Sequence, residues 1–265
     1  MPSLAWTARR FTAHRATGRL VRVIAVANQK GGVGKTTTAI HLAHALALAG
    51  VRTALLDLDP QGNATLALQG MQLDAAAFEA PVLEHLRPVA QSLWLLPSSG
   101  NARMARESRP NLQALQALAG VMDEAEFGFL VIDCPPRMDA WAWTGIGLAD
   151  EVLVPVQAEF LALQGLSQMM QTLADAQREF PGRSALLGVL ATMVDLREGV
   201  AREILSDLRN NLGTQVLRSV ILRDPLFIEA ASHGKTLFEY EFSSKGARSY
   251  LELAREVIHG RAKVG

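Results

Sequence analysis

The segment at residues 28–38, Asn-Gln-Lys-Gly-Gly-Val-Gly-Lys-Thr-Thr-Thr, constrains the fold more than any other part of the chain. It follows an apolar run at residues 23–27 and leads into a helical pattern at residues 38–49. A strand, a glycine-rich turn and a helix in this order are what a phosphate-binding loop requires. Glycines let backbone N–H groups converge on phosphate oxygens, and the helix N-terminus adds its partial positive charge. The pattern predicts that Lys35 neutralises the β- and γ-phosphates and that the Thr36 hydroxyl joins a Mg²⁺ shell.

The front of this loop departs from the common pattern. That pattern has a glycine five residues before Gly34, where this chain has Gln29. A second lysine, Lys30, follows the glutamine. The departure narrows the class of phosphate-loop protein more than a perfect match would.

Apolar runs alternate with helical patterns along the rest of the chain. Continuous apolar strands separated by helices indicate a parallel sheet covered on both faces, with ligands at the carboxyl ends of the strands. We therefore predict an α/β fold, a doubly wound and mostly parallel sheet flanked by helices, in one domain over residues 22–265. Strands are expected at residues 23–27, 53–57, 129–133, 151–155 and 186–194, and helices at residues 38–49, 111–124, 163–180, 202–211 and 245–259.

Three aspartates stand at the ends of predicted strands. Asp57 and Asp59 close the second strand, and Asp133 closes the third. A carboxylate in this place beside a phosphate loop holds Mg²⁺ through water or orients an attacking water. A single aspartate at a strand end is more often a helix cap or a turn residue. Three of them on the sheet edge that carries the loop favour a role in nucleotide chemistry.

Composition fits an enzyme-sized globular domain. Of the 265 residues 49% are apolar, which is enough for a substantial core, yet no apolar run approaches the length of a membrane span. The only cysteine, Cys134, excludes an internal disulfide and suits a reducing cytoplasm. Residues 1–21 form a basic leader rich in arginine and free of acidic residues. This leader is either a disordered extension or a basic arm that touches nucleic acid or a partner.

Three motifs together resemble the ParA/Soj family of partition ATPases, which belongs to the deviant Walker A group of phosphate-loop proteins. They are residues 30–37 (KGGVGKTT), 57–63 (DLDPQGN) and 131–136 (VIDCPP). Shorter similar segments continue through residues 149–167 and 229–254. The resemblance therefore covers roughly residues 22–260 of the chain.

The resemblance implies an ATPase with ATP and Mg²⁺ as cofactors. Lys30 matches the signature lysine that reaches across an ATP-sandwiched homodimer to the partner's nucleotide. Asp59 matches the aspartate that positions the hydrolytic water, and Lys35 acts with both in catalysis. Mg²⁺ would be supported by Thr36, Asp57 and Asp133. Further nucleotide contacts would come from Gly31, Gly32, Val33, Gly34 and Thr37.

Adenine and DNA contacts are also implied by the resemblance. In this family the adenine lies near the ends of the late strands, here at Met193, Arg223 and Pro225, although these positions could equally be ordinary strand ends. Family arginines that contact DNA are matched by Arg197 and Arg223, whereas Leu226 stands where relatives have a further arginine. Additional contacts to double-stranded DNA would come from Lys235, Lys245 and Arg248, with solvated surface charge as the alternative for each.

The implied function is that of a cytoplasmic, nucleoid-associated switch for chromosome or plasmid partition. It would dimerise on ATP, bind DNA non-specifically, and be stimulated to hydrolyse ATP by a ParB-like partner. The alternatives are a related positioning ATPase with a protein cargo, a regulator with weakened DNA binding, and a binding module without turnover. A membrane-cycling relative would need a C-terminal amphipathic anchor, for which residues 257–265 are short and polar. An iron–sulfur reductase of this group would need two cysteine ligands per subunit.

Overall fold

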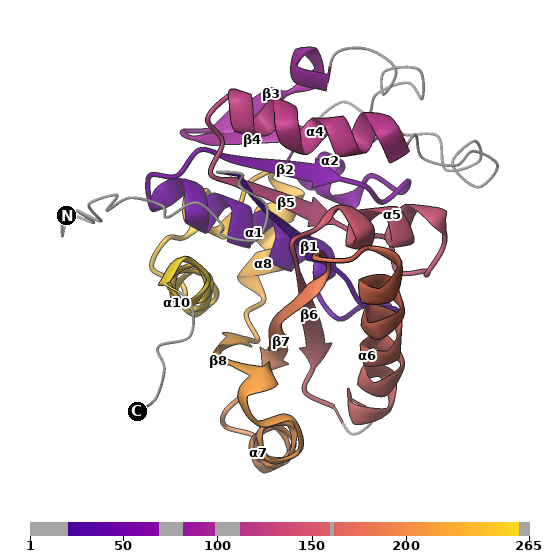
Figure 1. The fold of residues 1–265 in the computed structure, drawn as a ribbon. Coiled ribbons are helices and arrows are strands. Elements are labelled where there is room, and N and C mark those ends of the chain that lie inside the picture. Colours follow the sequence, from indigo (N-terminus) through magenta and orange to yellow (C-terminus); the bar gives the residue numbers. More distant parts are fainter. Residues whose placement is uncertain (1–20, 69–81, 99–111, 160–161, 260–265) are drawn as a thin grey trace.

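The computed structural model describes residues 21–68, 82–98, 112–159 and 162–259. Within these ranges the chain forms an eight-stranded sheet in the order β3-β4-β2-β5-β1-β6-β7-β8 (Figure 1). Every pairing is parallel except that of β3 with β4, so the predicted mostly parallel sheet is confirmed. The strands are β1 (Arg22–Val26), β2 (Thr53–Asp57), β3 (Arg87–Ala90), β4 (Leu93–Leu96), β5 (Phe129–Asp133), β6 (Glu151–Gln157), β7 (Ala185–Val194) and β8 (Val216–Leu222).

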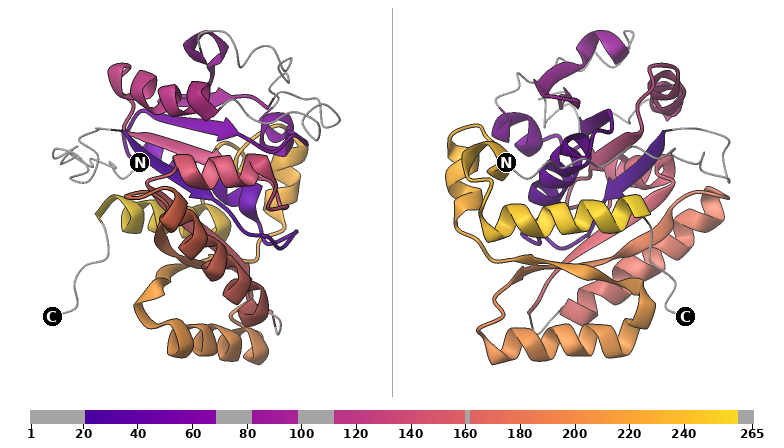
Figure 2. Two further views of the ribbon diagram at one scale, coloured as in Figure 1. Left: turned by 45° about the vertical axis from the view of Figure 1, so that its right-hand side comes forward. Right: turned by 90° about the vertical axis from the view of Figure 1, so that its left-hand side faces the viewer.

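Helices cover both faces of the sheet, as predicted for a doubly wound fold. Helices α1, α8, α9 and α10 pack on one face, and α4, α5, α6 and α7 pack on the other (Figure 2). None of the described helices is long and apolar enough to cross a membrane. The helices are α1 (Lys35–Leu48), α2 (Asn63–Ala67), α4 (Leu112–Glu124), α5 (Ala140–Leu148), α6 (Ala162–Glu179), α7 (Gly199–Leu212), α8 (Leu226–Ser232), α9 (Leu237–Tyr240) and α10 (Lys245–His259), with short 3-10 helices at Val82–His85 and Gly213–Gln215.

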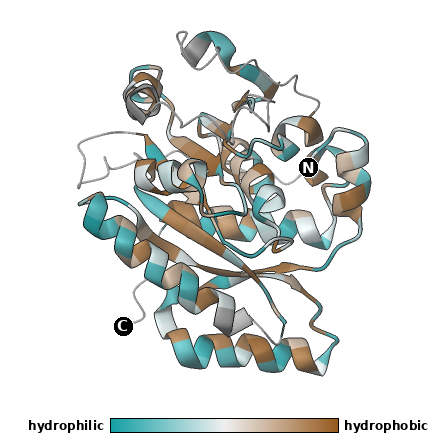
Figure 3. Ribbon diagram, turned by 90° about the vertical axis from the view of Figure 1, so that its right-hand side faces the viewer, coloured by the Kyte–Doolittle hydropathy of each residue, from teal (hydrophilic) through white to brown (hydrophobic). Residues whose placement is uncertain are grey.

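The two faces of the sheet produce two apolar layers. In β1, Val23 and Ala25 belong to the layer under α4, α5 and α6, whereas Ile24 and Val26 belong to the layer under α1 and α10. Strands β2 and β5 are buried along their whole length. This burial explains why they read as continuous apolar runs instead of alternating patterns. Figure 3 shows the hydrophobic strands lying between helices that carry hydrophilic residues on their outer sides.

Every predicted strand and helix is present, with ends that differ by up to three residues. β2, β5 and α10 have the predicted bounds. Helix α1 begins three residues before the prediction, at Lys35, because the phosphate loop turns directly into it through Gly34 at φ 84°. The ranges predicted from the sequence include none of β3, β4, β8, α2, α5, α8 and α9. β3 and β4 are four-residue strands, and β3 is an edge strand that contains Pro88. The predicted basic leader lies outside the described residues except for Val21, as do residues 260–265.

Sheet register brings the ends of three strands to one level. Asp133 pairs with Val26 of β1 on one side and with Asp57 of β2 on the other. The chain leaves β1 toward β2 on one side of the sheet and later continues through β6, β7 and β8 on the other side. Ligands bind at such a switch point, outside the carboxyl ends of the strands.

Helix α1, which follows the loop, is held by buried polar contacts. The Nδ1 atom of His41 lies 2.8 Å from the Thr37 carbonyl oxygen, and Nε2 accepts the Leu237 N–H at 3.1 Å. The His41 ring stacks on Tyr250, whose hydroxyl lies 3.0 Å from Thr38 Oγ1. Because Nε2 accepts, the proton resides on Nδ1 and the ring is neutral. Burial lowers the pKa of His41 to about 4.

We predict that His41 alone lowers the free energy of unfolding by about 2 kcal/mol between pH 7 and pH 5. The pKa of the imidazole is lower in the fold than its usual 6.5, so the unfolded chain binds more protons in this interval and acid favours unfolding. The His41→Gln variant should lose that part of the pH dependence. Urea denaturation at the two pH values measures it, and an equal loss of stability in both proteins would contradict the assignment.

Candidate active site

The phosphate loop runs from the end of β1 to the start of α1. Gly32 and Gly34 have φ angles of 76° and 84°, a region in which a side chain is strained. Nζ of Lys35 donates to the Lys30 carbonyl oxygen at 2.9 Å, and Oγ1 of Thr192 on β7 donates to the Val33 carbonyl oxygen at 2.9 Å. The first N–H groups of α1 have no acceptor within the helix. Loop and helix end therefore offer converging donors to a phosphate group.

Lys30 stands at the exposed front of the loop. Its N–H donates to Asn28 Oδ1 at 3.0 Å, and Nδ2 of Asn28 donates to the Pro155 carbonyl oxygen on β6 at 2.7 Å. The Lys30 ammonium lies 3.6 Å from Glu159 Oε2, and the two side chains are 39% and 53% exposed. Lys30 thus has an ordered backbone and a solvent-accessible charge, unlike the buried Lys35.

The three predicted aspartates lie together at the carboxyl ends of β2 and β5. Asp57, Asp59 and Asp133 are 1%, 5% and 0% exposed. Oδ2 of Asp57 accepts the Thr65 N–H at 2.8 Å and the Thr65 hydroxyl at 2.6 Å. Oδ1 of Asp59 accepts the Gln61 N–H at 2.9 Å. Neither carboxylate oxygen of Asp133 has a partner in good hydrogen-bond geometry in the described part of the chain, although the Thr36 hydroxyl lies close enough to lower the pKa of this carboxyl.

Burial shifts the pKa of every ionisable group in this cluster in the direction that favours its neutral form. It raises the pKa of Asp57 to about 6 and raises that of Asp59. The pKa of Asp133 is raised well above its ordinary value by burial and then by the neighbouring Asp57 charge. Burial also lowers the pKa of Lys35, which the nearby Asp133 charge opposes. More carboxylates than cations are buried here, so the cluster favours an added positive charge.

These residues fit Mg²⁺ bound together with a nucleotide. The unpartnered Asp133 carboxylate and the nearby Thr36 hydroxyl are hard oxygen donors, which Mg²⁺ prefers. No three His, Cys, Asp or Glu side chains within the described ranges are grouped to hold a metal ion by themselves. Mg²⁺ usually takes one or two protein oxygens and completes its shell with water and nucleotide phosphates. When bound, it would neutralise charge on the phosphates.

The three predicted adenine residues lie at the ends of β7 and β8. Met193, with φ 55°, lies beside the loop: its Cε is 3.7 Å from the position that a Cβ on Gly34 would take. The N–H of Arg223 donates to the Val194 carbonyl oxygen at 2.9 Å, which joins the two strand ends. Pro225 then precedes α8. The structure brings Met193 to the loop and places Arg223 and Pro225 on the segment that leaves the adjacent strand.

Known proteins share both the motifs and the arrangement described above. A family model for an AAA domain matches residues 21–185. The chromosome partitioning protein ParA of Caulobacter vibrioides is 36% identical over 251 residues, covering 90% of this chain and 94% of that one. The chromosome-partitioning ATPase Soj of Thermus thermophilus is 39% identical over 241 residues, covering 90% and 96%. The chain belongs to the ParA/Soj family.

Solved structures share the fold. Cobyrinic acid a,c-diamide synthase of Mycobacterium smegmatis, with bound ADP and magnesium, aligns with a TM-score of 0.75 at 31% identity, covering 90% of this chain and 94% of that one. The septum site-determining protein MinD of Pyrococcus horikoshii, in complex with Mg-ADP, aligns with a TM-score of 0.74 at 22% identity over 92% of this chain and 100% of that one, which bears on the fold alone. The predicted ATPase class and the cofactors ATP and Mg²⁺ are those of the ParA/Soj family.

The five residues predicted to contact DNA in this ParA/Soj chain are all exposed, but they do not form one cluster. Arg197 follows β7, Arg223 follows β8, and Lys245 begins α10, close enough to Asp195 for its charge to act on that carboxylate. Arg248 lies one turn further along α10. Lys235 lies apart, in the turn between α8 and α9.

Two local contacts modify this surface. The Arg197 guanidinium donates to both oxygens of Asp195, at 2.9 Å from Nε and 2.6 Å from Nη2. These bonds hold the pKa of Asp195 well below its usual range. Leu226 is half-buried and packs against the apolar layer of α1 and α10. Asp224 accepts the N–H groups of Leu226 at 3.2 Å and Gly246 at 2.9 Å, which ties α8 to the start of α10.

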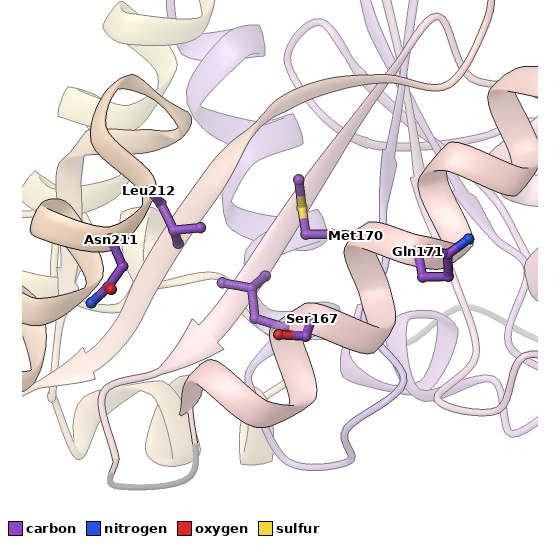
Figure 4. Close-up of a pocket in the computed structure, with 6 residues that line it drawn as sticks. Ser167, Met170, Gln171, Asn211 and Leu212 are labelled. Carbon is purple, nitrogen blue, oxygen red and sulfur yellow. The ribbon is translucent and has the colours of Figure 1, made fainter.

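A cavity of about 540 Å³ lies between α6 and α7 (Figure 4). None of its lining residues belongs to the phosphate loop or carries a charge, so the cavity lacks the donors that phosphates require. The lining consists of Leu166, Ser167, Met170, Gln171, Asn211 and Leu212.

Several contacting residues escaped prediction from the sequence. Thr65 bonds Asp57, Asn28 bonds β6, and Glu159 pairs with Lys30. Asn28 lies inside the recognised loop motif, so its position was a usable signal. Thr65 and Glu159 stand outside any motif with a chemical meaning of its own, and only the fold brings them to the site.

We predict that Asp133→Asn removes most of the gain in ATP affinity that Mg²⁺ provides. The buried carboxylate is the unpartnered oxygen donor of the site, and the amide carries no charge to offset the cation. Titration with a fluorescent ATP analogue, with Mg²⁺ and with EDTA, measures the gain. Asp150→Asn is the control, since Asp150 is also buried but directly precedes β6, at the amino ends of the strands and away from the phosphate loop. An unchanged Mg²⁺ effect in Asp133→Asn would contradict the assignment.

Proposed function

We propose that the protein is an ATP-dependent dimerising ATPase for chromosome or plasmid partition, acting in the cytoplasm at the nucleoid through one ATPase domain at residues 22–265. The observation that carries this proposal is the accessible charge of Lys30 at the front of a phosphate loop whose own lysine, Lys35, is buried. A phosphate loop needs one lysine for its own nucleotide. The second, directed outward, suits the nucleotide of another subunit.

Dimer closure requires Lys30 to exchange its partner. Its pairing with Glu159 is exposed, and exposed ion pairs contribute about 0–1 kcal/mol. A triphosphate of the partner subunit would displace Glu159 at small cost. Closure excludes water, which strengthens the attraction between Lys30 and the transferring phosphoryl group. Asp59, two residues after the end of β2, would orient the attacking water, while Lys35 and the loop amides would hold the phosphates.

Non-specific DNA binding is proposed for the surface at the ends of β7 and β8. Arg197, Arg223, Lys245 and Arg248 come from adjacent segments there, and Lys235 adds a more distant charge. Such residues neutralise backbone phosphates and carry no sequence preference. Because Thr192 of β7 bonds the loop at Val33, a change at the nucleotide can alter the surface that follows β7. A ParB-like partner would then release the protein by stimulating hydrolysis.

The second candidate is a positioning ATPase with a protein cargo or a regulator with weakened DNA binding. Two observations favour it. Leu226 packs into the core layer at a place where relatives have arginine, and the Arg197 guanidinium is engaged by Asp195. Both reduce the charge available to phosphates. DNA binding distinguishes the two candidates.

We predict that Lys30→Gln abolishes the ATP-dependent dimer and lowers hydrolysis by about 10²-fold or more, since charge supplied from a second subunit is worth at least that in related phosphoryl transfer. ATP binding by the single chain should persist through Lys35. Light scattering after size-exclusion chromatography and phosphate release measure the two effects. Lys235→Gln, an exposed lysine remote from the loop, should behave as wild type. Equal dimerisation of Lys30→Gln and wild type would refute the proposal.

For DNA, we predict that Arg223→Ala lowers the slope of log affinity against log salt by about 0.9 in ATP, the contribution of one phosphate contact. Leu226→Arg should tighten binding at low salt. Fluorescence anisotropy with a labelled duplex across a salt series measures both. Arg178→Ala, which removes an exposed arginine on α6, is the matched control and should not change the slope. Absence of ATP-dependent binding even at low salt would favour the protein-cargo candidate.

A further inference from the structure

Gln29, which replaces the glycine of the common phosphate-loop pattern, makes a specific contact with helix α6. Its Nε2 donates to Thr172 Oγ1 at 2.7 Å, across 143 residues of sequence. The Thr172 hydroxyl in turn donates to the Gln168 carbonyl oxygen at 3.1 Å. Because the hydroxyl proton is used in the bond to Gln168, the Thr172 oxygen is free to accept the Nε2–H of Gln29. Glycine at position 29 could not make this bond.

The three residues at the front of the loop are each held from a different side. Asn28 bonds the Pro155 carbonyl oxygen of β6, and Gln29 bonds α6. The Lys30 N–H donates to Asn28, and the Lys30 carbonyl oxygen accepts from Lys35. The backbone of Lys30 is therefore fixed on both sides, while its side chain ends in the exchangeable pair with Glu159.

We propose that Gln29 is a positioning residue, which through Thr172 fixes the front of the loop so that Lys30 is presented to a second subunit. This inference rests on the proposed function. A lysine that must reach a partner's phosphate loses rotamer and backbone freedom when it binds. The bond from Gln29 to α6 restricts the backbone in advance and so reduces that entropic cost.

The consequence is a separation of effects between the two lysines. Phosphate binding within one chain uses Lys35, Gly32, Gly34 and the start of α1, all of which follow the restrained front of the loop. Loss of the bond between Gln29 and Thr172 should therefore weaken dimerisation and turnover more than nucleotide binding. A purely structural role would lower the stability and all activities together.

The test compares Gln29→Ala, Thr172→Val and the double variant in the full chain, with Thr172→Ser as the conservative variant that keeps the hydroxyl. ATP-analogue titration at low protein concentration reports binding by the single chain, light scattering with ATP reports dimerisation, and phosphate release gives kcat. One neutral hydrogen bond corresponds to about a three- to ten-fold change in an equilibrium. We expect both single variants to lose dimerisation and kcat by this factor, while their ATP affinity stays within about two-fold of wild type. Thr172→Ser should dimerise and turn over nearly as well as wild type.

The double variant should lose no more dimerisation or kcat than the more impaired single variant, because the two substitutions remove the same hydrogen bond. Additive losses, or an ATP affinity that falls in parallel with kcat, would overturn the inference. The inference would also be overturned if Gln29→Ala and Thr172→Val dimerise like wild type while Lys30→Gln does not. In that case the proposed function would still stand. If Lys30→Gln itself dimerises normally, the proposed function fails, whatever the Gln29 variants do. Thermal unfolding of each variant shows whether a loss arises from stability, and a common drop in stability and activity counts against the inference.

Discussion

Burial of charge at the carboxyl ends of β1, β2 and β5 is the constraint on which the rest of the site depends. Parallel register sets Asp133 between Val26 and Asp57, so that carboxylates and Lys35 share one dry region. Burial alone disfavours every one of these charges. The fold supports them with the Thr65 bonds to Asp57 and leaves Asp133 unpartnered. Buried carboxylates outnumber the buried lysine here, and an added cation would favour their charged form, so the site suits a nucleotide that arrives with Mg²⁺.

The sequence predicts the position of these residues in the fold where a short motif is also a structural unit. The glycine spacing predicts the turn, and the apolar runs of β2 and β5 predict strands that begin and end where the structure has them. The turn and the strands are predictable because each is determined by residues close together in the sequence. Asp57 and Asp133 follow from those strand ends. β4 and β8 escape prediction because the former is too short to show a pattern and the latter contains Arg218 and Ser219. Contacts such as Thr172 with Gln29 depend on tertiary packing and carry no local signal.

Restraint is unequally distributed between the two lysines of the loop. Lys35 is buried and held by the carbonyl oxygen of Lys30, so its position belongs to the single chain. Lys30 has a fixed backbone but an exposed ammonium whose partner, Glu159, is itself exposed. A group that is ordered at its base and free at its tip can change partners without rearranging the fold. That combination is what a contact between subunits requires, and the buried lysine could not provide it.

The same reasoning applies to the surface beyond β7 and β8. Leu226 contributes to the packing of α8 against α1 and α10, and Asp224 fastens that corner to the start of α10. An arginine at position 226 would exchange this apolar contact for an exposed charge, and long side chains of this kind can keep their stems packed while the head reaches water. The corner can therefore tolerate either residue. Under the proposed function, affinity for DNA at this corner would depend on Arg223 and Lys245, and on whether a phosphate can compete with Asp195 for Arg197.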